Sequence, residues 1–504
     1  MQQILLFGAG KSATALIHYL LKHSTADGSR LVVVDADAAL AQKKIDGHSN
    51  GIAVSFDINN AAERRAQIAA STLVISLLPP ALHDTVAEDC LALNKHLLTA
   101  SYVDDRMRAL SEAAAQKGLL FLCEMGLDPG IDHMSAAQMI ANIRSRGGKI
   151  TSFLSHCGGL VAPESDDNPW HYKISWNPRN VVLAGKAGAH FRQDGKEEHW
   201  PYEKLFAEQR FVNIPGWEPL CWYPNRDSLS YAPLFGLEGC PTFIRTTLRH
   251  PDFMWGWKNV IDLKLTDEVT IYDTADKTLH QFFGEHMTAH GFDTWLQQKM
   301  LEGINQSKDI LQSLLQLVEM EQQLNEKQKT EVENFMTVGP KGTLQQRGLE
   351  EVKTAAAATV AQNMHNSKLT LSQLFFLGMD DEHTRIKGDR NTAADVLQQA
   401  LEAKLVLHPT DKDRVVMLHE IGYEQDGKNF VDRGSLIVDG TDGAHTAMAK
   451  TVGLPLGIAA RGILQNTLKG TGVTVPVTKD IYDWVLPQLA TEGIAFTHST
   501  TAVD

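Results

Sequence analysis

Groups that could exchange protons gather in one stretch of the chain, residues 123–133, which reads CEMGLDPGIDH. They are Glu124, Asp128, Asp132 and His133. An apolar strand leads into the stretch, glycine and proline turn the chain, and a helix follows. Open α/β sheets bind ligands where strands end in such turns, so these groups are candidates for acid–base chemistry. The spacing leaves a second interpretation open, in which Asp128 or Asp132 only caps the helix.

A second candidate site lies near the start of the chain, where residues 8–13 read GAGKSA and match the pattern GxGxxA. The turn follows an apolar strand and opens a helix, which is the placement that dinucleotide-binding folds require. Gly8 allows the tight turn, Gly10 lets the backbone approach a pyrophosphate, and Ala13 permits close helix packing. The alternative is a glycine-rich turn without a ligand. The predicted cofactor loop comprises Gly8, Ala9, Gly10, Lys11 and Ser12.

An acidic residue, Asp35, ends the second apolar run, 25 residues after Gly10. A carboxylate near this position hydrogen-bonds the ribose 2′-hydroxyl and repels a 2′-phosphate. No arginine follows it directly, since the next residues are Ala36 and Asp37. The residues therefore favour NAD as the cofactor, with NADP possible, unless Asp35 is an ordinary surface residue at a strand end.

The elements that would position both sites are short apolar runs that alternate with helical patterns through the first 123 residues. Nearly uninterrupted apolar runs are typical of parallel strands buried on both faces. We therefore predict an α/β fold with a doubly wound parallel sheet of six strands, the Rossmann type. The predicted strands are Ile4–Phe7, Leu31–Val34, Ala53–Phe56, Leu73–Leu77, His96–Thr99 and Leu119–Leu122, with helices over Ser12–Lys22 and Ala38–Lys44.

The loops after the fourth and fifth predicted strands carry further candidates, because both should lie at the nicotinamide edge of the sheet. The fourth strand ends in SLLPP (residues 76–80), and the fifth ends in TASY (residues 99–102). The hydroxyl groups of Ser101 and Tyr102 suit a substrate carboxylate, although such side chains are more often ordinary loop residues.

From residue 149 the pattern changes to β-rich segments dense in Trp and Tyr, which predict a mixed sheet in a second domain. A strand over Lys149–Ser155 ends near Cys157, a thiol that either reacts or simply packs. Its neighbour His156 would point to the opposite face, so the two do not form a catalytic dyad. Arg226 and Arg249 could each bind a carboxylate through two hydrogen bonds, or could be surface residues. Further strands are predicted at Ala189–Arg192, Phe243–Leu248 and Val260–Lys264.

Residues 294–403 are rich in Gln, Leu, Glu and Lys and predict a helical region with a break at Gly339–Gly342. No heptad persists across it, which excludes an extended coiled coil. Strands are predicted at Arg414–Ile421 and Ser435–Asp439, around a hairpin near Asp426-Gly427, and a final strand at Ile494–Ser499. Gly443–Leu464 is predicted to form two helices joined by a turn at Gly453–Pro455.

The overall composition excludes several classes of function. A formal net charge of −14 argues against general binding to nucleic acid or anionic membranes. Five cysteines without a CxxC pair indicate free thiols in a reducing compartment. No apolar run reaches the length of a membrane span, and the first residues lack the features of a signal peptide, so we expect a cytoplasmic protein. The spacings of zinc-finger, HExxH and P-loop sites are absent, and no metal is predicted.

Eight segments, in order along the chain, resemble the saccharopine dehydrogenase family of the L-glutamate-forming type, also called saccharopine reductase. The likeness covers nearly the whole chain and is greatest to the dehydrogenase half of the bifunctional animal aminoadipic semialdehyde synthase. It is weakest over about residues 185–215 and 290–390. The segments are SLLP (76–79), TASYV (99–103), GLDPGIDH (126–133), CGGLVAPES with DNP (157–169), YKISW (172–176), YPNRDS (223–228), TLR (247–249) and HTAMAKTVGLP (445–455).

The resemblance implies the oxidation of saccharopine by NAD(P)⁺ and water to glutamate and 2-aminoadipate 6-semialdehyde, a reaction of lysine metabolism. It also implies a homodimer of three-domain subunits. The Rossmann domain would comprise residues 1–125 and about 443–467, and a helical domain about 286–403. A mixed α/β substrate and dimerisation domain would comprise about 126–285, 404–442 and 468–504.

The resemblance also assigns roles to residues of this chain. Asp128, Cys157 and Tyr102 are the catalytic residues that the resemblance implies, and Asp128 would hold the substrate amine or assist proton transfer. Leu78, Ala100 and Leu127 would join Asp35 and the first loop in binding the cofactor. The implied substrate-binding residues are Ser101, Tyr102, Asp128, Arg226, Thr247, Leu248 and Arg249.

Departures from the family keep other interpretations open. Pro80 stands where the animal-like and fungal forms carry an aromatic residue, and the fungal form has an arginine after the position of Asp35 that suits NADP. The alternatives are a related amine dehydrogenase or synthase, such as lysine 6-dehydrogenase or carboxynorspermidine synthase, and a regulator that binds NAD without catalysis.

Overall fold

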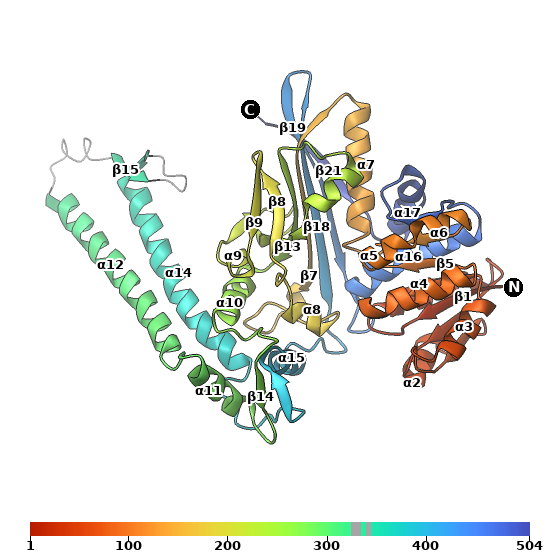
Figure 1. The fold of residues 1–504 in the computed structure, drawn as a ribbon. Coiled ribbons are helices and arrows are strands. Elements are labelled where there is room, and N and C mark those ends of the chain that lie inside the picture. Colours follow the sequence, from red (N-terminus) through yellow and green to blue (C-terminus); the bar gives the residue numbers. More distant parts are fainter. Residues whose placement is uncertain (324–333, 339–343, 504) are drawn as a thin grey trace. The chain divides into compact units, whose positions relative to one another are not determined.

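The computed structural model describes residues 1–323, 334–338 and 344–503 (Figure 1). The chain divides into two compact units, Met1–Pro251 with Leu405–Asp504, and Asp252–Lys404. The predicted Rossmann sheet and the predicted mixed sheet fall together in the first unit, and the helical region falls in the second. The predicted break at Gly339–Gly342 lies outside the described residues.

The first sheet consists of seven parallel strands: β1 (Gln2–Phe7), β2 (Ser29–Val34), β3 (Gly51–Val54), β4 (Leu73–Ser76), β5 (His96–Thr99), β6 (Leu120–Leu122) and β20 (Gly472–Thr474). Their order is β20-β6-β5-β4-β1-β2-β3. This is the dinucleotide-binding order with one further strand beside β6, so the predicted fold class is confirmed. The sequence did not predict β20, which is only three residues long and lies far along the chain.

Helices cover both faces of this sheet and bury its apolar runs in two clusters. On one face lie α1 (Ala13–Ser24), α2 (Ala38–Ile45), α16 (Ala447–Leu464) and α17 (Lys479–Thr491). On the other face lie α3 (Ala61–Ala70), α4 (His83–Ala92), α5 (Asp105–Ala109) and α6 (Ser111–Gln116), with a short 3-10 helix η1 (Pro80–Leu82). Chain order reverses between β1 and β4, and such a switch point is where ligands bind in open sheets.

Helix α16 corrects one prediction, because the chain runs through Gly453 and Pro455 without a turn. Tertiary packing overrides the local signals: a Cβ at Gly453 would lie 2.9 Å from the backbone nitrogen of Leu16, so glycine lets α16 pack closely on α1. The carboxylate of Asp413 caps the helix by accepting the N–H groups of Ala447 and its successor at 2.5 and 2.9 Å. By length and composition α16 could span a membrane, which the sequence analysis did not expect. It is 78% buried inside the protein, as a core helix is.

The second sheet has ten strands and is mixed, as predicted. Its main path is β10-β11-β13-β7-β18-β19-β21, in which β13 and β7 run parallel and the other neighbours antiparallel. The strands are β7 (Lys149–Val161), β8 (Ala189–Gln193), β9 (Lys196–Trp200), β10 (Arg210–Val212), β11 (Leu220–Pro224), β12 (Arg226–Asp227), β13 (Thr242–Arg249), β18 (Asp413–Gln425), β19 (Lys428–Asp439) and β21 (Thr497–Val503).

The strand predicted to end at Ser155 continues to Val161, because β18 pairs with it along its whole length. Helix α7 (Ile131–Ser145) leads into this strand from the proton-exchanging stretch. The remaining short elements of the first unit are η2 (Pro163–Ser165), α8 (Pro178–Val182), α9 (Tyr202–Leu205) and η3 (Leu229–Phe235).

The second unit is mostly helical, and the predicted strand at Val260–Lys264 is wrong. Its first three residues belong to α10 (Pro251–Asp262) and the last two lie in the turn that follows. The helix buries Phe253, Trp257 and Val260 at a helical spacing that the apolar run alone concealed. The other elements are α11 (Leu279–Ala289), α12 (Trp295–Gln323), α14 (Leu349–Phe376), α15 (Ala393–Lys404), and the strand pairs β14 (Ile271–Asp273) with β17 (Arg390–Thr392) and β15 (Asn334–Val338) with β16 (Leu344–Gly348).

Candidate active site

The turn after β6 is fastened to the end of β5 by backbone hydrogen bonds. The N–H groups of Glu124 and Met125 donate to the carbonyl oxygens of Ser101 and Thr99 at 3.1 and 3.0 Å. Gly130 closes the turn with a φ of +145°, where a Cβ would overlap the backbone of Gly126. The residues between them are therefore held at the carboxyl edge of the parallel sheet.

Asp128 lies in this turn, and its carboxylate is almost covered by protein. The guanidinium of Arg245 donates to it, and the hydroxyl of Tyr102 donates to the same oxygen at 3.5 Å. Burial raises the pKa of Asp128 to about 6, although the positive charge of Arg245 opposes this shift. A carboxyl group with such a pKa can hold an amine or exchange a proton near neutral pH.

Arg245 is a site residue that the sequence analysis missed. Its side chain is 4% exposed, and the guanidinium also donates to Asp132 at 3.0 Å. It lies 4.3 Å from the ring centroid of Tyr231. The available signal was the alternation along the predicted strand, since Arg245, Thr247 and Arg249 follow at every second residue and share one face.

Asp132 is more than the helix cap that the sequence suggested. One of its oxygens accepts the N–H of Gly130 at 2.6 Å, and the other faces both Arg245 and His133. Although burial acts to raise it, His133 and Arg245 together hold the pKa of Asp132 below its ordinary value. Asp132 therefore carries a negative charge behind Asp128.

A buried pair, Glu124 and His133, extends this row of charges into the protein. The two side chains are hydrogen-bonded at 2.8 Å, and the other ring nitrogen of His133 lies 3.4 Å from Asp132. The carboxylate of Glu124 also accepts the N–H of Val103 at 3.0 Å and the hydroxyl of Tyr231 at 3.5 Å. These contacts fix α7 to the loop after β5.

The wall opposite Asp128 comes from β7 and β13. Cys157 and Thr247 are paired in register across these strands, and alternation places them on the face that carries Arg245. Burial, and next the negative charge of Asp128, raise the pKa of Cys157 well above its ordinary value, so the group is a thiol. His156 points to the other face, where it is hydrogen-bonded to Thr246 at 2.7 Å, and the predicted absence of a Cys–His dyad is confirmed.

The other predicted substrate residues differ in how exposed they are and in which way they face relative to Arg245. Arg226 is exposed, with its guanidinium 5.4 Å from the ring of Tyr102. Leu248 is fully buried and points away from the Arg245 face. Arg249, the last residue of β13, is buried on the Arg245 face, with its guanidinium 5.4 Å from the ring of Tyr172.

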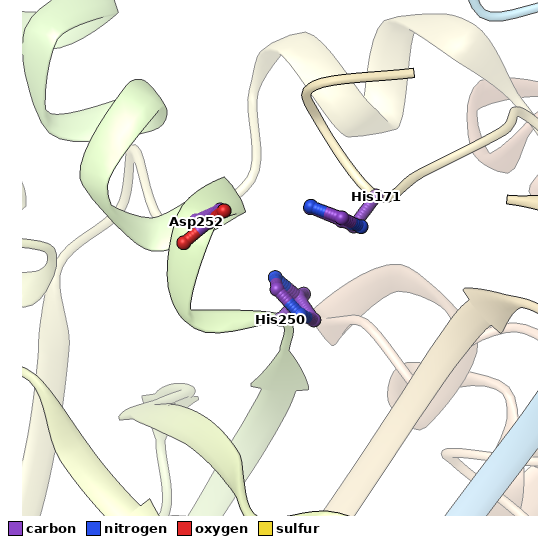
Figure 2. Close-up of side chains that lie close together, drawn as sticks. All are labelled: His171, His250 and Asp252. Carbon is purple, nitrogen blue, oxygen red and sulfur yellow. The ribbon is translucent and has the colours of Figure 1, made fainter. Parts of the chain in front are cut away.

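A loop beside the end of β13 is fastened by two histidines. The imidazole rings of His171 and His250 stack with centroids 3.9 Å apart, and Figure 2 shows the two rings close together. His171 is also paired with Asp166 at 2.6 Å. The stack ties the loop that carries Tyr172 to the residue that follows Arg249.

Ser101 is positioned by a histidine that the sequence analysis also missed. The ring of His83 is hydrogen-bonded to Ser101 at 2.7 Å and to Ser76, at the end of β4, at 2.8 Å. Burial lowers the pKa of His83 to about 4, so the ring is neutral at pH 7. The ring therefore joins the ends of two neighbouring strands without adding charge.

The first loop has the geometry that a dinucleotide requires. Gly8 has a φ of +98°, and a Cβ there would lie 2.7 Å from the backbone oxygen of Leu77. At Gly10, by contrast, a Cβ would meet no atom within 4 Å, which leaves room for a pyrophosphate. Ser12 makes no side-chain capping bond at the start of α1, so the helix N–H groups can face a phosphate.

Asp35 binds this loop directly. One carboxylate oxygen accepts the N–H of Ala9 at 2.7 Å, and the other accepts the N–H of Asp37 at 2.9 Å. The ammonium group of Lys44 donates to the carbonyl oxygen of Gly10. A cation therefore stands near the predicted ribose acid, a feature that the sequence analysis did not consider.

The remaining predicted cofactor residues are spread around the sheet edge. The ammonium of Lys11 donates to the carbonyl oxygen of Ile174 at 3.3 Å. Leu78 and Ala100 are half-buried and pack on opposite faces of the sheet. Leu127 is 6% exposed and packs in the core beside Asp128.

Comparison with known proteins agrees with these features and confirms the resemblance found in the sequence. A model of the saccharopine dehydrogenase NADP binding domain matches residues 4–122, and one of the saccharopine dehydrogenase C-terminal domain matches residues 126–494. The chain is 29% identical to saccharopine dehydrogenase [NADP(+), L-glutamate-forming] of Pyricularia oryzae, over 97% of this chain and 96% of that protein. It is 28% identical to the mitochondrial alpha-aminoadipic semialdehyde synthase of Bos taurus, over 99% of this chain and 48% of that protein.

A solved structure gives the same result at the level of the fold. The apo histidine-tagged saccharopine dehydrogenase (L-Glu forming) from Saccharomyces cerevisiae superposes with a TM-score of 0.78 at 26% identity. The match covers 100% of both chains.

Proposed function

We propose, from the premise that the chain belongs to the saccharopine dehydrogenase family, that it is the L-glutamate-forming enzyme of lysine metabolism. It would oxidise saccharopine with a nicotinamide dinucleotide and water to glutamate and 2-aminoadipate 6-semialdehyde. The observation that carries the proposal is the buried carboxyl group of Asp128, held at the edge of the parallel sheet between Tyr102 and Arg245.

The chemistry requires one proton acceptor and several cationic anchors. Saccharopine is a secondary amine with three carboxylates, and the bound dinucleotide would accept the hydride that leaves the CH₂ carbon next to the amine. Water adds to the resulting C=N bond, and the adduct breaks its C–N bond to give the aldehyde and the amine of glutamate. The sum is R–CH₂–NH₂⁺–R′ + NAD(P)⁺ + H₂O → R–CHO + R′–NH₃⁺ + NAD(P)H + H⁺.

We assign the proton-handling roles to Asp128 and Tyr102. A carboxylate with a pKa of about 6 can pair with the substrate ammonium and take its proton. Burial, and next the charge of Asp128, raise the pKa of Tyr102, so its hydroxyl stays a hydrogen-bond donor. Cys157 would line the substrate pocket as a neutral thiol.

The substrate carboxylates would be bound by Arg226 and Arg249, with help from hydroxyl groups. Arg226 is exposed beside Tyr102 and can move to a ligand, whereas Arg249 is buried and fixed. The other proposed substrate contacts are Ser101, Thr247 and the neighbouring Leu248.

The loop at residues 8–12 would hold the dinucleotide pyrophosphate, and we propose that NADP is a usable cofactor. The sequence favoured NAD because of Asp35, but the comparisons do not support that preference, since the fungal relatives carry NADP(+) in their names. Both oxygens of Asp35 already accept backbone N–H groups, which supports a role in holding the loop. Lys44 offers a cation nearby for a 2′-phosphate.

The cellular context follows from the same family assignment and from the thiols. We propose a cytoplasmic homodimer, with the three-domain division given above. None of the five cysteines, all of which lie in the described part of the chain, forms a disulfide, which supports a reducing compartment.

The proposal is tested by following absorbance of the reduced dinucleotide at alkaline pH. Saccharopine, lysine and carboxynorspermidine would each be supplied with NAD⁺ and with NADP⁺. We expect turnover of saccharopine and formation of glutamate. Turnover of lysine or carboxynorspermidine in its place would assign a sibling enzyme, and binding of a dinucleotide without any turnover would assign a regulator.

A further inference from the structure

The guanidinium of Arg245 is buried among two carboxylates and two tyrosine rings of the candidate active site. It contacts Asp128 and Asp132 with one nitrogen, and the side chain is 4% exposed. The rings of Tyr231 and Tyr102 lie 4.3 and 5.9 Å from its central carbon. A charge this buried is stable only because it is paired, so the contacts fix both partners.

The surroundings favour a supporting role over direct binding of a substrate carboxylate. Arg245 already faces two carboxylates, and Asp132 is held in turn by His133 and by the N–H of Gly130. The contacts continue through His133 to Glu124, so a chain of buried polar side chains runs from the protein interior to Asp128. Arg226 and Arg249 lie outside this set of side chains.

We propose that Arg245 is a positioning residue that orients the Asp128 carboxylate toward the substrate amine and keeps it ionised, while Asp132 holds the guanidinium in place from behind. The proposal rests on the proposed function. It adds a residue whose effect on the reaction passes through Asp128.

The charges around Asp128 give this proposal a pH signature. Burial raises the pKa of Asp128 and Arg245 lowers it, with the net result near 6. Loss of the guanidinium leaves the burial and the charge of Asp132, so the carboxylate should take up its proton at higher pH. The titratable and charged groups that face Asp128 from the packed elements are Tyr102, Asp132, His133, Cys157 and Arg245.

The test compares Arg245→Lys and Arg245→Met with Asp132→Asn, and takes Arg414→Met as the matched control. Arg414 is a partly buried arginine of β18 that pairs with Asp439, away from Asp128. Rates would be measured from pH 5 to 9 with saccharopine and NADP⁺, and folding would be checked by urea denaturation. We expect kcat to fall about tenfold in Arg245→Lys and about a thousandfold in Arg245→Met, with the KM of the dinucleotide unchanged.

The acid limb of the pH profile should move up by about one to three pH units in Arg245→Met, less in Arg245→Lys, and not in the control. Asp132→Asn should move the limb by a smaller amount in the opposite direction, because it removes a negative charge that raises the pKa of Asp128. A rise in the KM of saccharopine without any movement of the limb would make Arg245 a direct carboxylate clamp and overturn the proposal.

An infrared titration separates this proposal from the proposed function. The difference between wild type and Asp128→Asn reports the carboxyl band of Asp128 without turnover. We expect that band, identified by difference from the Arg245→Met, Asp128→Asn double variant, to titrate at higher pH in Arg245→Met. An unshifted band would overturn the positioning role, whereas a shifted band in a protein that does not oxidise saccharopine would leave the role standing and reject the reaction.

Discussion

The loop that follows β1 and the turn that follows β6 lie at the same edge of the parallel sheet, but they are held in different ways. The first loop is held by backbone groups, with N–H donors of Ala9 and Asp37 on one nearby carboxylate, Asp35. The turn at Asp128 also has backbone hydrogen bonds, but the carboxylate that it carries is held by a side chain 117 residues away in the sequence, Arg245. One region is built from local geometry, and the other from buried charges brought together by the fold.

This difference has a physical consequence for function. Backbone dipoles at a helix start bind any phosphate with little dependence on pH, which suits a common cofactor. Buried side-chain charges alter each other's protonation strongly, because the interior screens them weakly. Such an arrangement suits the step in which a substrate proton must move.

The largest effect is expected from substituting a glycine in each region. Gly130 is needed because there is no room for a side chain, whereas Gly10 leaves space for a ligand. Gly130→Ala should lower the free energy of unfolding by about 4 kcal/mol or prevent folding, because a Cβ there would overlap the backbone of Gly126. Gly10→Ala is the matched control, with open space around its Cβ. It should change stability by less than about 1 kcal/mol and weaken dinucleotide binding about tenfold. Urea denaturation and calorimetric titration measure both, and a stable Gly130→Ala protein would contradict the geometry of the turn.

Asp128→Asn should impair catalysis at the turn after β6 without affecting dinucleotide binding at the loop after β1. We expect kcat for saccharopine to fall about 10²- to 10⁴-fold, because the amide cannot accept the substrate proton. The Kd of the dinucleotide, measured by fluorescence quenching, should change less than threefold. Equal losses in both quantities would mean that the two regions are not separate in function.

Asp35→Ala tests whether the carboxylate of Asp35 holds the loop at residues 8–12 in place or selects NAD⁺ over NADP⁺. If Asp35 mainly holds the loop, both NAD⁺ and NADP⁺ should bind about tenfold more weakly, with little change in their ratio. Asp37→Ala is the matched control. Asp37 lies with Asp35 between β2 and α2, and its carboxylate caps α2. If Asp35→Ala instead bound NADP⁺ more tightly with NAD⁺ affinity unchanged, Asp35 would be the residue that selects NAD over NADP, as the sequence suggested.

The smallest effect is expected at His83, which joins the ends of β4 and β5. Its pKa in the folded protein is about 4, below its ordinary value of 6.5, so the unfolded chain binds more protons between these values. Stability from His83 is therefore complete above pH 6.5 and is lost as the pH falls toward 4. Between pH 7.5 and 5.5 the wild type should lose about 1 kcal/mol more than His83→Gln in urea denaturation. An identical pH dependence in the two proteins would show that the ring is not buried in its neutral form.

The features that the sequence could predict are those set by neighbouring residues. The apolar runs predicted six of the seven strands of the parallel sheet, and GAGKSA placed its loop between a strand and a helix. The turn made Asp128 a candidate, but its spacing left a helix-capping role equally open, and the resemblance to the family favoured the functional role. Contacts between distant segments escaped prediction, and the pairing of Arg245 with Asp128 is the main example.

The predictions that failed have related causes. The turn expected at Pro455 is absent because α16 is buried against α1, where close packing outweighs the missing hydrogen bond. The strand expected at Val260–Lys264 is instead the end of α10 and the turn after it, because a short apolar run fits either a buried strand or a buried helix.

The most direct test of the proposed L-glutamate-forming reaction is to identify which carbon of saccharopine gives the hydride. Saccharopine would be prepared with deuterium either on the CH₂ carbon beside the amine or on the glutamyl α-carbon, and the reduced dinucleotide would be examined by mass spectrometry. The account predicts that label moves from the CH₂ carbon to the nicotinamide and that glutamate is released. Label transferred from the glutamyl α-carbon, with release of lysine, would contradict it.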